Sequence, residues 1–284
     1  MKTENELKSL CIQVRRDIVR MVHAVNSGHP GGSLGCTEYF VALYFEIMKH
    51  NPAKFTMDGI GEDVFFLSNG HISPVFYSVL ARSGYFPVSE LATFRKLNSR
   101  LQGHPTTHEH LPGVRIASGS LGQGMSVGLG AALAKKLNND NSLVYTLHGD
   151  GELNEGQIWE AAMYAAGKKV DNIICTVDMN GQQIDGSTDS VMPLGDLEAK
   201  FKAFGWDVLK IADGNNIGQV IEGLKTAKTH TGKGKPVVIL MKTEMGAGVD
   251  FMMGSHKWHG VAPNDAQLAQ ALEQLTTTGT IGDY

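Results

Sequence analysis

Residues 143–157 read LVYTLHGDGELNEGQ. The first five letters are a β-rich run of the kind that forms a buried strand, and a helical pattern follows at residues 155–168. Between the two, Gly149 and Gly151 flank Asp150, so the chain can turn sharply and present one carboxylate at the end of the strand. A tight turn is the simpler interpretation. The alternative, a hard oxygen ligand for a metal ion, requires a second group nearby.

Comparable β-rich runs recur on both sides of this stretch and alternate with helical patterns. We expect strands at residues 64–67, 143–147, 173–177, 208–211 and 237–241. Helices are expected at residues 73–83, 122–138, 155–168 and 215–230, after a first amphipathic helix that ends near residue 26. This order predicts an α/β fold with a doubly wound, mainly parallel sheet and helices on both faces. We expect one domain over residues 1–275 and a C-terminal tail at 276–284.

Composition limits the kind of partner that the chain can have. It has 284 residues, of which 42% are hydrophobic, and a formal net charge of -4 without a run of like charges. This balance favours neither nucleic acid nor a membrane surface, and no apolar stretch approaches the roughly 20 residues that span a bilayer. The first ten residues lack the apolar core of a signal peptide, so a cytoplasmic protein is expected. The three cysteines have no metal-binding spacing and are interpreted as packing residues.

A second oxygen side chain follows the next strand. The run at residues 173–177 ends in Asp178-Met179-Asn180, thirty residues after Asp150. Because ligands of such folds bind at the carboxyl ends of parallel strands, Asp150 and Asn180 should converge there. Mg²⁺ takes six oxygens and obtains only one or two from side chains, so an Asp, an Asn and a carbonyl would suit a metal that bridges a diphosphate.

A Gly-Asp-Gly followed about thirty residues later by Asn is the signature of thiamine diphosphate enzymes, and the surrounding loops resemble transketolases. Seven motifs occur in the order and spacing of that family: SGHPG at 27–31, LSNGH at 67–71, GHP at 103–105, GSLGQG at 119–124, GDG at 149–151, Asn180 with IDG at 184–186, and GSHKWHG at 254–260. The resemblance implies that Asp150, the side chain of Asn180 and the backbone carbonyl of Gln182 hold Mg²⁺, Ca²⁺ or Mn²⁺.

The same resemblance assigns cofactor and substrate contacts. It implies that Gly151 contacts the diphosphate through its backbone, and that the cofactor is further contacted by His71, Gly119, Ser120, Leu121, Glu155, Asn180 and His259. His29, His71, His104 and His259 would form a catalytic cluster, since ketol transfer moves protons near neutral pH, where histidine titrates. For each histidine the alternative is a loop residue that hydrogen-bonds backbone carbonyls. Glu155 and Glu160 mark either a subunit contact or a solvated helix face.

Three glycines recur on the expected helix at 122–138. Gly124, Gly128 and Gly130 are interpreted as positions of close backbone packing against another helix, because polar residues and two lysines interrupt the pattern that a membrane helix would need.

Members of this family that work as one chain carry further domains, including the glutamate that contacts the pyrimidine of the cofactor. The resemblance, with Gly32-Ser33 and Gly181-Gln182-Gln183, is to the diphosphate-binding N-terminal subunit of a split, two-chain transketolase. We therefore expect a C-terminal partner subunit in an α2β2 heterotetramer, acting on sugars or sugar phosphates. A deoxyxylulose-phosphate synthase-like or 2-oxo acid dehydrogenase-like component stays open, as does an inert paralogue that serves as scaffold or regulator. The sequence does not identify the ketose donor, the aldose acceptor, the partner chain or the pathway.

Overall fold

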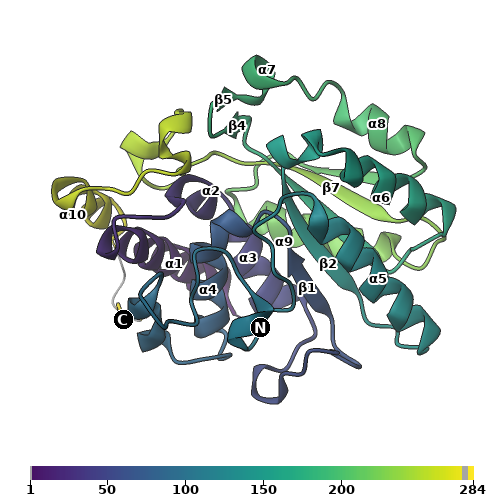
Figure 1. Ribbon diagram of the computed structural model, residues 1–284, viewed down its shortest axis with the longest axis horizontal. Coiled ribbons are helices and arrows are strands. Elements are labelled where there is room, and N and C mark those ends of the chain that lie inside the picture. The colour runs from purple at the N-terminus through teal and green to yellow at the C-terminus, as the bar shows by residue number, and fades with distance from the viewer. Residues whose placement is uncertain (1, 277–280) are drawn as a thin grey trace.

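A five-stranded parallel sheet forms the centre of the chain in a computed structural model, which describes residues 2–276 and 281–284 (Figure 1). The strand order is β1-β2-β3-β7-β6, and all four neighbouring pairs are parallel. The strands are β1 (Val64–Leu67), β2 (Val144–Gly149), β3 (Ile173–Met179), β6 (Asp207–Ile211) and β7 (Val237–Lys242). The predicted parallel sheet is confirmed: β1, β2, β3 and β7 are almost entirely buried, and the edge strand β6 is only partly buried.

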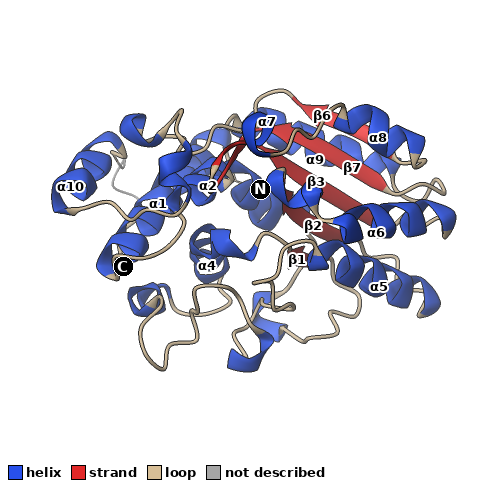
Figure 2. Cartoon of the chain, turned by 45° about the horizontal axis from the view of Figure 1, so that its top comes forward, coloured by secondary structure: helices blue, strands red, loops and turns tan. Residues whose placement is uncertain are grey.

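Helices cover both faces of this sheet (Figure 2). One face packs against α1 (Glu4–Ala24), α3 (Thr37–Ala42), α4 (Ser73–Arg82) and α9 (Ile217–His230). The other packs against α5 (Gln123–Leu137), α6 (Gly156–Gly167) and α8 (Leu197–Ala203). The remaining elements are shorter or peripheral: α2 (Pro30–Gly35), α7 (Thr188–Val191), α10 (Asp265–Gln274) and the small hairpin β4 (Gln182–Gln183) and β5 (Gly186–Ser187).

Side chains alternate between the two cores along each central strand. In β3, Ile173, Cys175 and Val177 belong to the core under α5 and α6, whereas Ile174 belongs to the core under α1 and α9. Period-two alternation places neighbouring residues on opposite faces of a sheet, so an uninterrupted apolar strand supplies both cores. Cys11, Cys36 and Cys175 are all buried, which agrees with their interpretation as packing residues.

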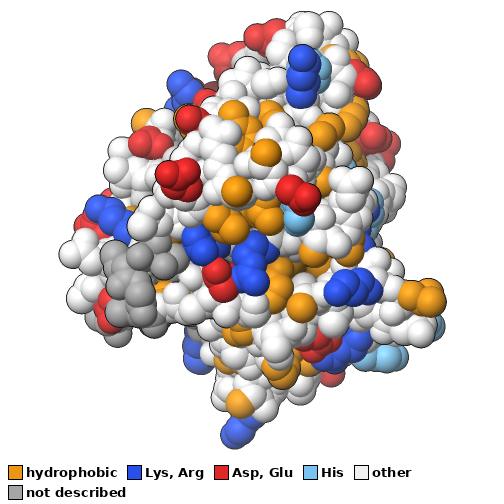
Figure 3. All heavy atoms as spheres, turned by 90° about the vertical axis from the view of Figure 1, so that its left-hand side faces the viewer, with side chains coloured by type: hydrophobic (Ala, Val, Ile, Leu, Met, Phe, Trp, Pro, Cys, Tyr) orange, Lys and Arg blue, Asp and Glu red, His pale blue; other side chains and the backbone are white. Residues whose placement is uncertain are grey.

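The last four residues lie against α1. Asp283 accepts hydrogen bonds from Arg16 at 2.8 and 3.0 Å and from Gln13 at 2.9 Å, and the ring of Tyr284 lies 4.4 Å from the Arg20 guanidinium. Residues 277–280, which belong to the expected tail, are outside the described residues. The face that carries this C-terminal segment shows basic, acidic and hydrophobic side chains side by side, without a field of one charge (Figure 3).

The glycines of α5 differ in their surroundings. A Cβ on Gly124 would lie 2.4 Å from Ser68 Cβ, and one on Gly128 would lie 2.6 Å from Thr146 Cγ2. A Cβ on Gly130 would meet nothing within 4 Å. Gly124 and Gly128 are therefore close-packed as predicted, but against the sheet and not against another helix. The prediction was wrong for Gly130, which faces away from the sheet. Among the described residues, no helix has the length and hydrophobicity to cross a bilayer.

Candidate active site

Parallel strands bring their carboxyl ends to one edge of the sheet, and polar loops from β1, β2 and β3 meet there. Both oxygens of Asp150 accept backbone N–H groups, from Gly151 at 2.7 Å and from Gly181 at 2.6 Å. Asn180 Oδ1 accepts the N–H of Gln182 at 2.8 Å. A cavity of about 130 Å³ opens beside them, and its lining includes Asn69, His71, Leu121, Asp150, Gly151, Glu152, Asp178, Asn180, Gln182, Gln183 and His259.

The charged side chains that line this cavity are all acidic, which favours a bound cation. Three carboxylates line it, those of Asp150, Glu152 and Asp178, and no lysine or arginine does. Burial and the negative charge of Asp178 raise the pKa of Asp150 to about 7. Burial also raises the pKa of Asp178, which accepts hydrogen bonds from Thr243 and from Asn180 Nδ2. A divalent cation would stabilise both carboxylates in their charged form.

The oxygen atoms available at this cavity could fill part of the coordination shell of a magnesium ion. In the part of the chain that the structure describes, no three His, Cys, Asp or Glu residues are grouped so that they could hold a metal. The predicted ligand set is of another kind, one carboxylate, one amide oxygen and one backbone carbonyl, from Asp150, Asn180 and Gln182. Such a set leaves half of an octahedral shell for phosphate oxygens and water, which is how Mg²⁺ is usually held in phosphate sites. The residues present therefore fit a metal-bound diphosphate.

Four loop histidines converge at the same edge. The ring centroid of His29 lies 5.2 Å from that of His71, 6.1 Å from that of His104 and 5.6 Å from that of His259. The His71 and His259 centroids are 5.0 Å apart. The structure thus brings together side chains from four loops that are far apart in the sequence, and two of them, His71 and His259, also line the cavity.

These histidines have pKa values below that of free histidine. Burial is the main cause in each, and the charges of neighbouring histidines add to it for His29 and His71. The pKa values of His104 and His259 are lowered by burial as well. At pH 7 the cluster is therefore neutral, so each ring can accept a proton at one nitrogen and donate from the other. His29 Nδ1 is buried without a hydrogen-bond partner and is free to meet a ligand.

The neutral state of His29 can be tested by measuring how the free energy of unfolding changes with pH. The pKa of His29 is lowered to about 4 by burial, whereas in the unfolded chain it is about 6.5. Between these values the unfolded state binds more protons, so stability is present above pH 6.5 and is lost as pH falls. We expect His29→Gln to reduce the loss of unfolding free energy between pH 7 and pH 5 by about 1 kcal/mol, after allowance for partial exposure. Urea unfolding at both pH values measures this, and equal losses in the two proteins would contradict it.

Three predicted cofactor contacts lie away from the cavity wall in this chain. Gly119 and Ser120 are exposed, and a Cβ on Gly119 would lie 3.7 Å from His104 Cβ, so this loop adjoins the histidine cluster. Glu155 is exposed at the start of α6, and Glu160 is exposed one turn further on. Neither acid lines the cavity. Their places on an open helix face agree with either a subunit contact or a solvated surface.

Sequence reasoning missed Glu152. Its buried carboxylate accepts the N–H of Gly122 at 2.7 Å, the N–H of Gly149 at 3.0 Å and the hydroxyl of Ser68. His148 Nδ1 lies 3.6 Å from the same group. One side chain thus links the loops after β1 and β2 to the loop before α5. Nothing in the sequence marks it, because an acid in the 3-10 turn Gly151–Asn154 would normally be solvated.

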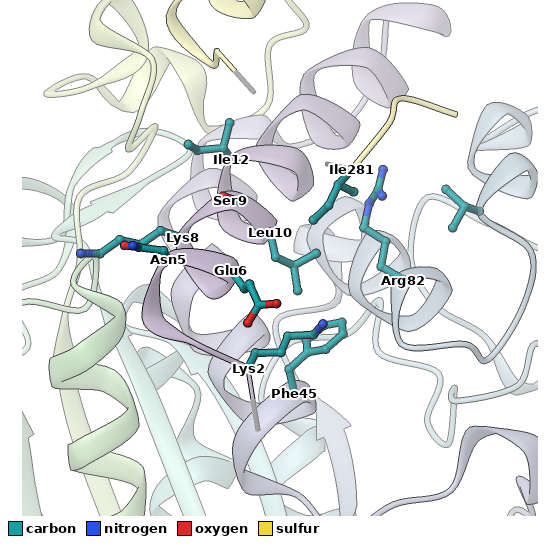
Figure 4. Close-up of a pocket in the computed structure, with 11 residues that line it drawn as sticks. Lys2, Asn5, Glu6, Lys8, Ser9, Leu10, Ile12, Phe45, Arg82 and Ile281 are labelled. Atoms are coloured by element: carbon teal, nitrogen blue, oxygen red, sulfur yellow. The ribbon is translucent and has the colours of Figure 1, made fainter. Parts of the chain in front are cut away.

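A larger cavity, of about 810 Å³, lies elsewhere, between the start of α1 and the end of α4 (Figure 4). Its lining includes Lys2, Glu6, Phe45, Arg82 and Ile281. It shares no residue with the lining of the smaller cavity beside Asp150 and Asn180, which we call the strand-end cavity. Arg82 is already paired with Asp17 at 2.5 Å, and Glu6 caps α1 with Thr3. The smaller cavity, at the strand ends, is therefore the candidate active site.

Known proteins resemble this chain over nearly its whole length. Residues 8–279 match the family model described as the thiamine diphosphate binding domain of transketolase. The chain is 38% identical over 269 residues to the 6-deoxy-6-sulfo-D-fructose transketolase subunit SqwG of Clostridium sp. (strain MSTE9), covering 94% of both proteins. It is 36% identical to one of the subunits of the apulose-4-phosphate transketolase of Actinobacillus succinogenes, covering 95% of this chain and 96% of that protein.

Solved structures show the same relationship. The transketolase of Campylobacter jejuni superposes with a TM-score of 0.88 at 33% identity, over 99% of this chain and 44% of that one. The chain thus spans nearly the whole of its subunit-sized relatives and less than half of that solved transketolase. The predicted family and the predicted thiamine diphosphate-binding fold are both confirmed. This chain belongs to the transketolase family and is its N-terminal, thiamine diphosphate-binding type of subunit.

Proposed function

We propose that this chain transfers a two-carbon ketol unit from a ketose to an aldose, together with a separate C-terminal subunit. The observation that carries the proposal is that Asp150, Asn180 and Gln182, the ligands that we propose for a divalent cation, line a cavity that adjoins the cluster of four neutral histidines. A cation site alone would suit many phosphate-binding proteins. The histidines beside it supply the proton exchange that ketol transfer needs.

The cofactor would be held mainly through its charged end. Asp150, the Asn180 amide oxygen and the Gln182 carbonyl would bind Mg²⁺, and Ca²⁺ or Mn²⁺ could take its place. Gly151, His71 and His259 line the same cavity and would contact the diphosphate. Bound thiamine diphosphate supplies the carbon nucleophile of the thiazolium ring. The remainder of the cofactor would lie along or beside Gly119, Ser120, Leu121 and Glu155.

The histidines would manage the substrate. A neutral imidazole can hydrogen-bond a sugar hydroxyl in either direction, so His29, His104 and His259 can orient a polyol and take a proton from it. His71 is the most buried ring of the four and lies at the cavity, where it would position the cofactor end of the substrate.

The names of the relatives favour ketol transfer over the alternatives. Two of them are described as transketolase subunits for 6-deoxy-6-sulfo-D-fructose and for apulose-4-phosphate, both of which are sugars with a terminal anionic group. We infer an anionic ketose, phosphorylated or sulfonated, as donor. Because the proposed metal ligands Asp150 and Asn180 are both present, an inert scaffold is disfavoured. The composition of the chain supports a cytoplasmic location.

A partner subunit would cover an open apolar face. On α5 the exposed positions include Val127 and Gly130, and on α6 they include Met163 and Tyr164, whose exposed fractions are 60% and 46%. The two helices pack against each other, and we propose that these side chains belong to one surface. An apolar surface of this kind is typical of a protein interface. We propose that it joins this chain to its partners in an α2β2 heterotetramer.

The function is tested by purifying the tagged chain from its own cells in buffer with magnesium. We expect a complex with a second chain that carries thiamine diphosphate, visible by native mass spectrometry. That complex should convert a ketose phosphate and an aldose phosphate into the products of two-carbon transfer. A homo-oligomer without cofactor and without this activity would overturn the proposal in favour of an inert paralogue.

The interface is tested by Gly130→Gln. The new side chain meets nothing within 4 Å in this chain, and replacing a helical glycine should leave the fold unharmed or stabilise it by about 0.5–1 kcal/mol. At a packed interface the same side chain would overlap the partner, so we expect assembly to weaken at least tenfold in an analytical ultracentrifugation titration. Lys225→Gln is the control, since this exposed residue of α9 lies on the opposite face of the sheet from α5 and α6. Unchanged assembly of Gly130→Gln would remove this face from the interface.

A further inference from the structure

Asp178, the second-to-last residue of β3, is a buried carboxylate without a cationic partner. Its side chain is 1% exposed, yet it lines the strand-end cavity. Within the part of the chain that the structure describes, none of the ion pairs includes Asp178. Buried carboxylates are ordinarily paired with a cation or a metal, so an unpaired one at a cavity wall is expected to have a task there.

This carboxylate determines how the side-chain amide of Asn180 is turned. Asn180 Nδ2 donates to Asp178 Oδ2 at 2.8 Å, and Asn180 Oδ1 accepts the N–H of Gln182 at 2.8 Å. The donor end and the acceptor end of an asparagine amide have nearly the same shape, so its hydrogen-bond partners decide which way it points. Because Asp178 occupies the nitrogen, the oxygen keeps its second lone pair for a cation. The reverse orientation would place the amide oxygen against the carboxylate.

The main chain of Asp178 holds the other proposed side-chain ligand, Asp150. The strands β2 and β3 are paired so that Gly149 lies opposite Asp178, and the N–H of Asp150 donates to the Asp178 carbonyl at 3.1 Å. Asp178 is therefore hydrogen-bonded to both Asp150 and Asn180. A substitution of its side chain removes only the contact with Asn180, because the main-chain contact does not depend on the side chain.

Two residues outside the cavity hold the carboxylate of Asp178 in place. The hydroxyl of Thr243, directly after β7, donates to Asp178 Oδ1. The thiol of Cys36, between α2 and α3, is a further hydrogen-bond donor to the same carboxylate. Both side chains are buried, and neither lines the strand-end cavity. Because Oδ1 and Oδ2 are engaged by different partners, the carboxylate cannot turn without losing one of these hydrogen bonds.

We propose that Asp178 is a positioning residue of the metal site: its carboxylate keeps Asn180 Oδ1 available to the cation, and Thr243 keeps the carboxylate in place. The inference rests on the proposed function, since it takes Asp150, Asn180 and Gln182 as the metal ligands. It extends the site to the end of β7, a strand that carries none of these three ligands. Loss of a residue that orients a metal ligand typically lowers metal affinity by about 10–100-fold.

The role of Asp178 is tested by titrating Mn²⁺ into the complex with its partner, in the presence of thiamine diphosphate, and following free Mn²⁺ by EPR. We expect Asp178→Leu, which keeps the approximate volume but offers no acceptor, to weaken Mn²⁺ binding about 100-fold. Asp178→Asn loses the charge but keeps an acceptor oxygen for Asn180 Nδ2, so it should weaken binding only about tenfold. Equal weakening by the two variants would overturn the proposal, because loss of the negative charge alone would then explain the effect.

Thr243→Val changes neither the charge nor any side chain at the cavity wall. We expect it to weaken Mn²⁺ binding about fivefold, since the carboxylate of Asp178 loses the donor that holds Oδ1. Unchanged binding would remove Thr243 from the proposal. Asp58→Leu is the control for the loss of one negative charge, because Asp58 is exposed and does not line the strand-end cavity. It should change Mn²⁺ affinity by less than about twofold.

The proposed function and this inference fail in different ways. If the unaltered complex shows no saturable Mn²⁺ binding, the proposed metal site is wrong. If the unaltered complex binds Mn²⁺ and Asp178→Leu binds it equally well, the metal site stands and only the role of Asp178 is wrong. Thermal melts of each variant show whether a loss of affinity comes from misfolding.

A second measurement needs neither metal nor activity. In ¹H–¹⁵N NMR spectra of the cofactor-free chain, the side-chain amide signals of Asn180 are assigned through Asn180→Asp, which removes them. We expect the amide proton that is bound to Asp178 to lie downfield and to exchange slowly with solvent, and to lose both properties in Asp178→Leu. Asn180 amide signals that are unchanged in Asp178→Leu would overturn the proposal, whatever the metal affinity.

Discussion

Asp150→Asn is expected to lower the affinity of the complex for thiamine diphosphate in the presence of Mg²⁺ by about 100-fold or more, and to abolish turnover. Loss of a residue that merely orients a metal ligand already costs 10–100-fold, so loss of a charged ligand should cost at least as much. The amide keeps the shape of the carboxylate and one acceptor oxygen for the N–H groups of Gly151 and Gly181. Isothermal titration of the cofactor at fixed Mg²⁺ measures the effect.

The fold of this variant should survive. Without a metal, the charged Asp150 is disfavoured beside Asp178, and its removal offsets the loss of one hydrogen-bond acceptor. We expect the melting temperature of the cofactor-free chain to stay within a few degrees. Asp189→Asn, an exposed aspartate on α7, provides the control and should leave cofactor affinity unchanged. Full cofactor affinity in Asp150→Asn would show that Asp150 is not a metal ligand.

Glu152→Gln is expected to destabilise the chain by about 3 kcal/mol and to weaken cofactor binding 10–100-fold. An amide nitrogen in place of one oxygen would face the N–H of Gly122 or of Gly149, so at least one buried donor loses its acceptor. Burial by itself lowers the pKa of His148, but its contacts with Cys175 and Glu152 outweigh burial and raise the pKa to about 9. The variant would therefore leave a buried imidazolium without its counter-charge.

Urea unfolding and cofactor titration together measure this prediction. Glu160→Gln, an exposed acid on α6, is the control and should change stability by less than about 0.5 kcal/mol. The double variant with His148→Leu should regain part of the lost stability, because it removes the unpaired cation as well. If Glu152→Gln unfolds at the same urea concentration as the unaltered chain, the carboxylate does not hold the three loops together.

Much of the site was predictable because its residues are tied to strand ends. Asp150 and Asn180 each follow a β-rich run, and parallel strands leave their carboxyl ends at one edge. The loop histidines were found through their motifs, not through any periodicity. Glu152 was not found, since an acid in a short turn is ordinarily solvated. Only its burial sets it apart.

By itself, the sequence determined the parallel α/β fold, the family and the identity of the residues at the strand ends. These follow from local patterns. Apolar runs form strands that are buried on both faces, glycines permit the sharp turns, and the order of the motifs can be read directly along the chain. Only the tertiary structure decided which polar groups are paired and which are left free, because pairing depends on distances between loops far apart in the chain. The same dependence explains why Gly124 is confined by Ser68 while Gly130, six residues on, faces open space.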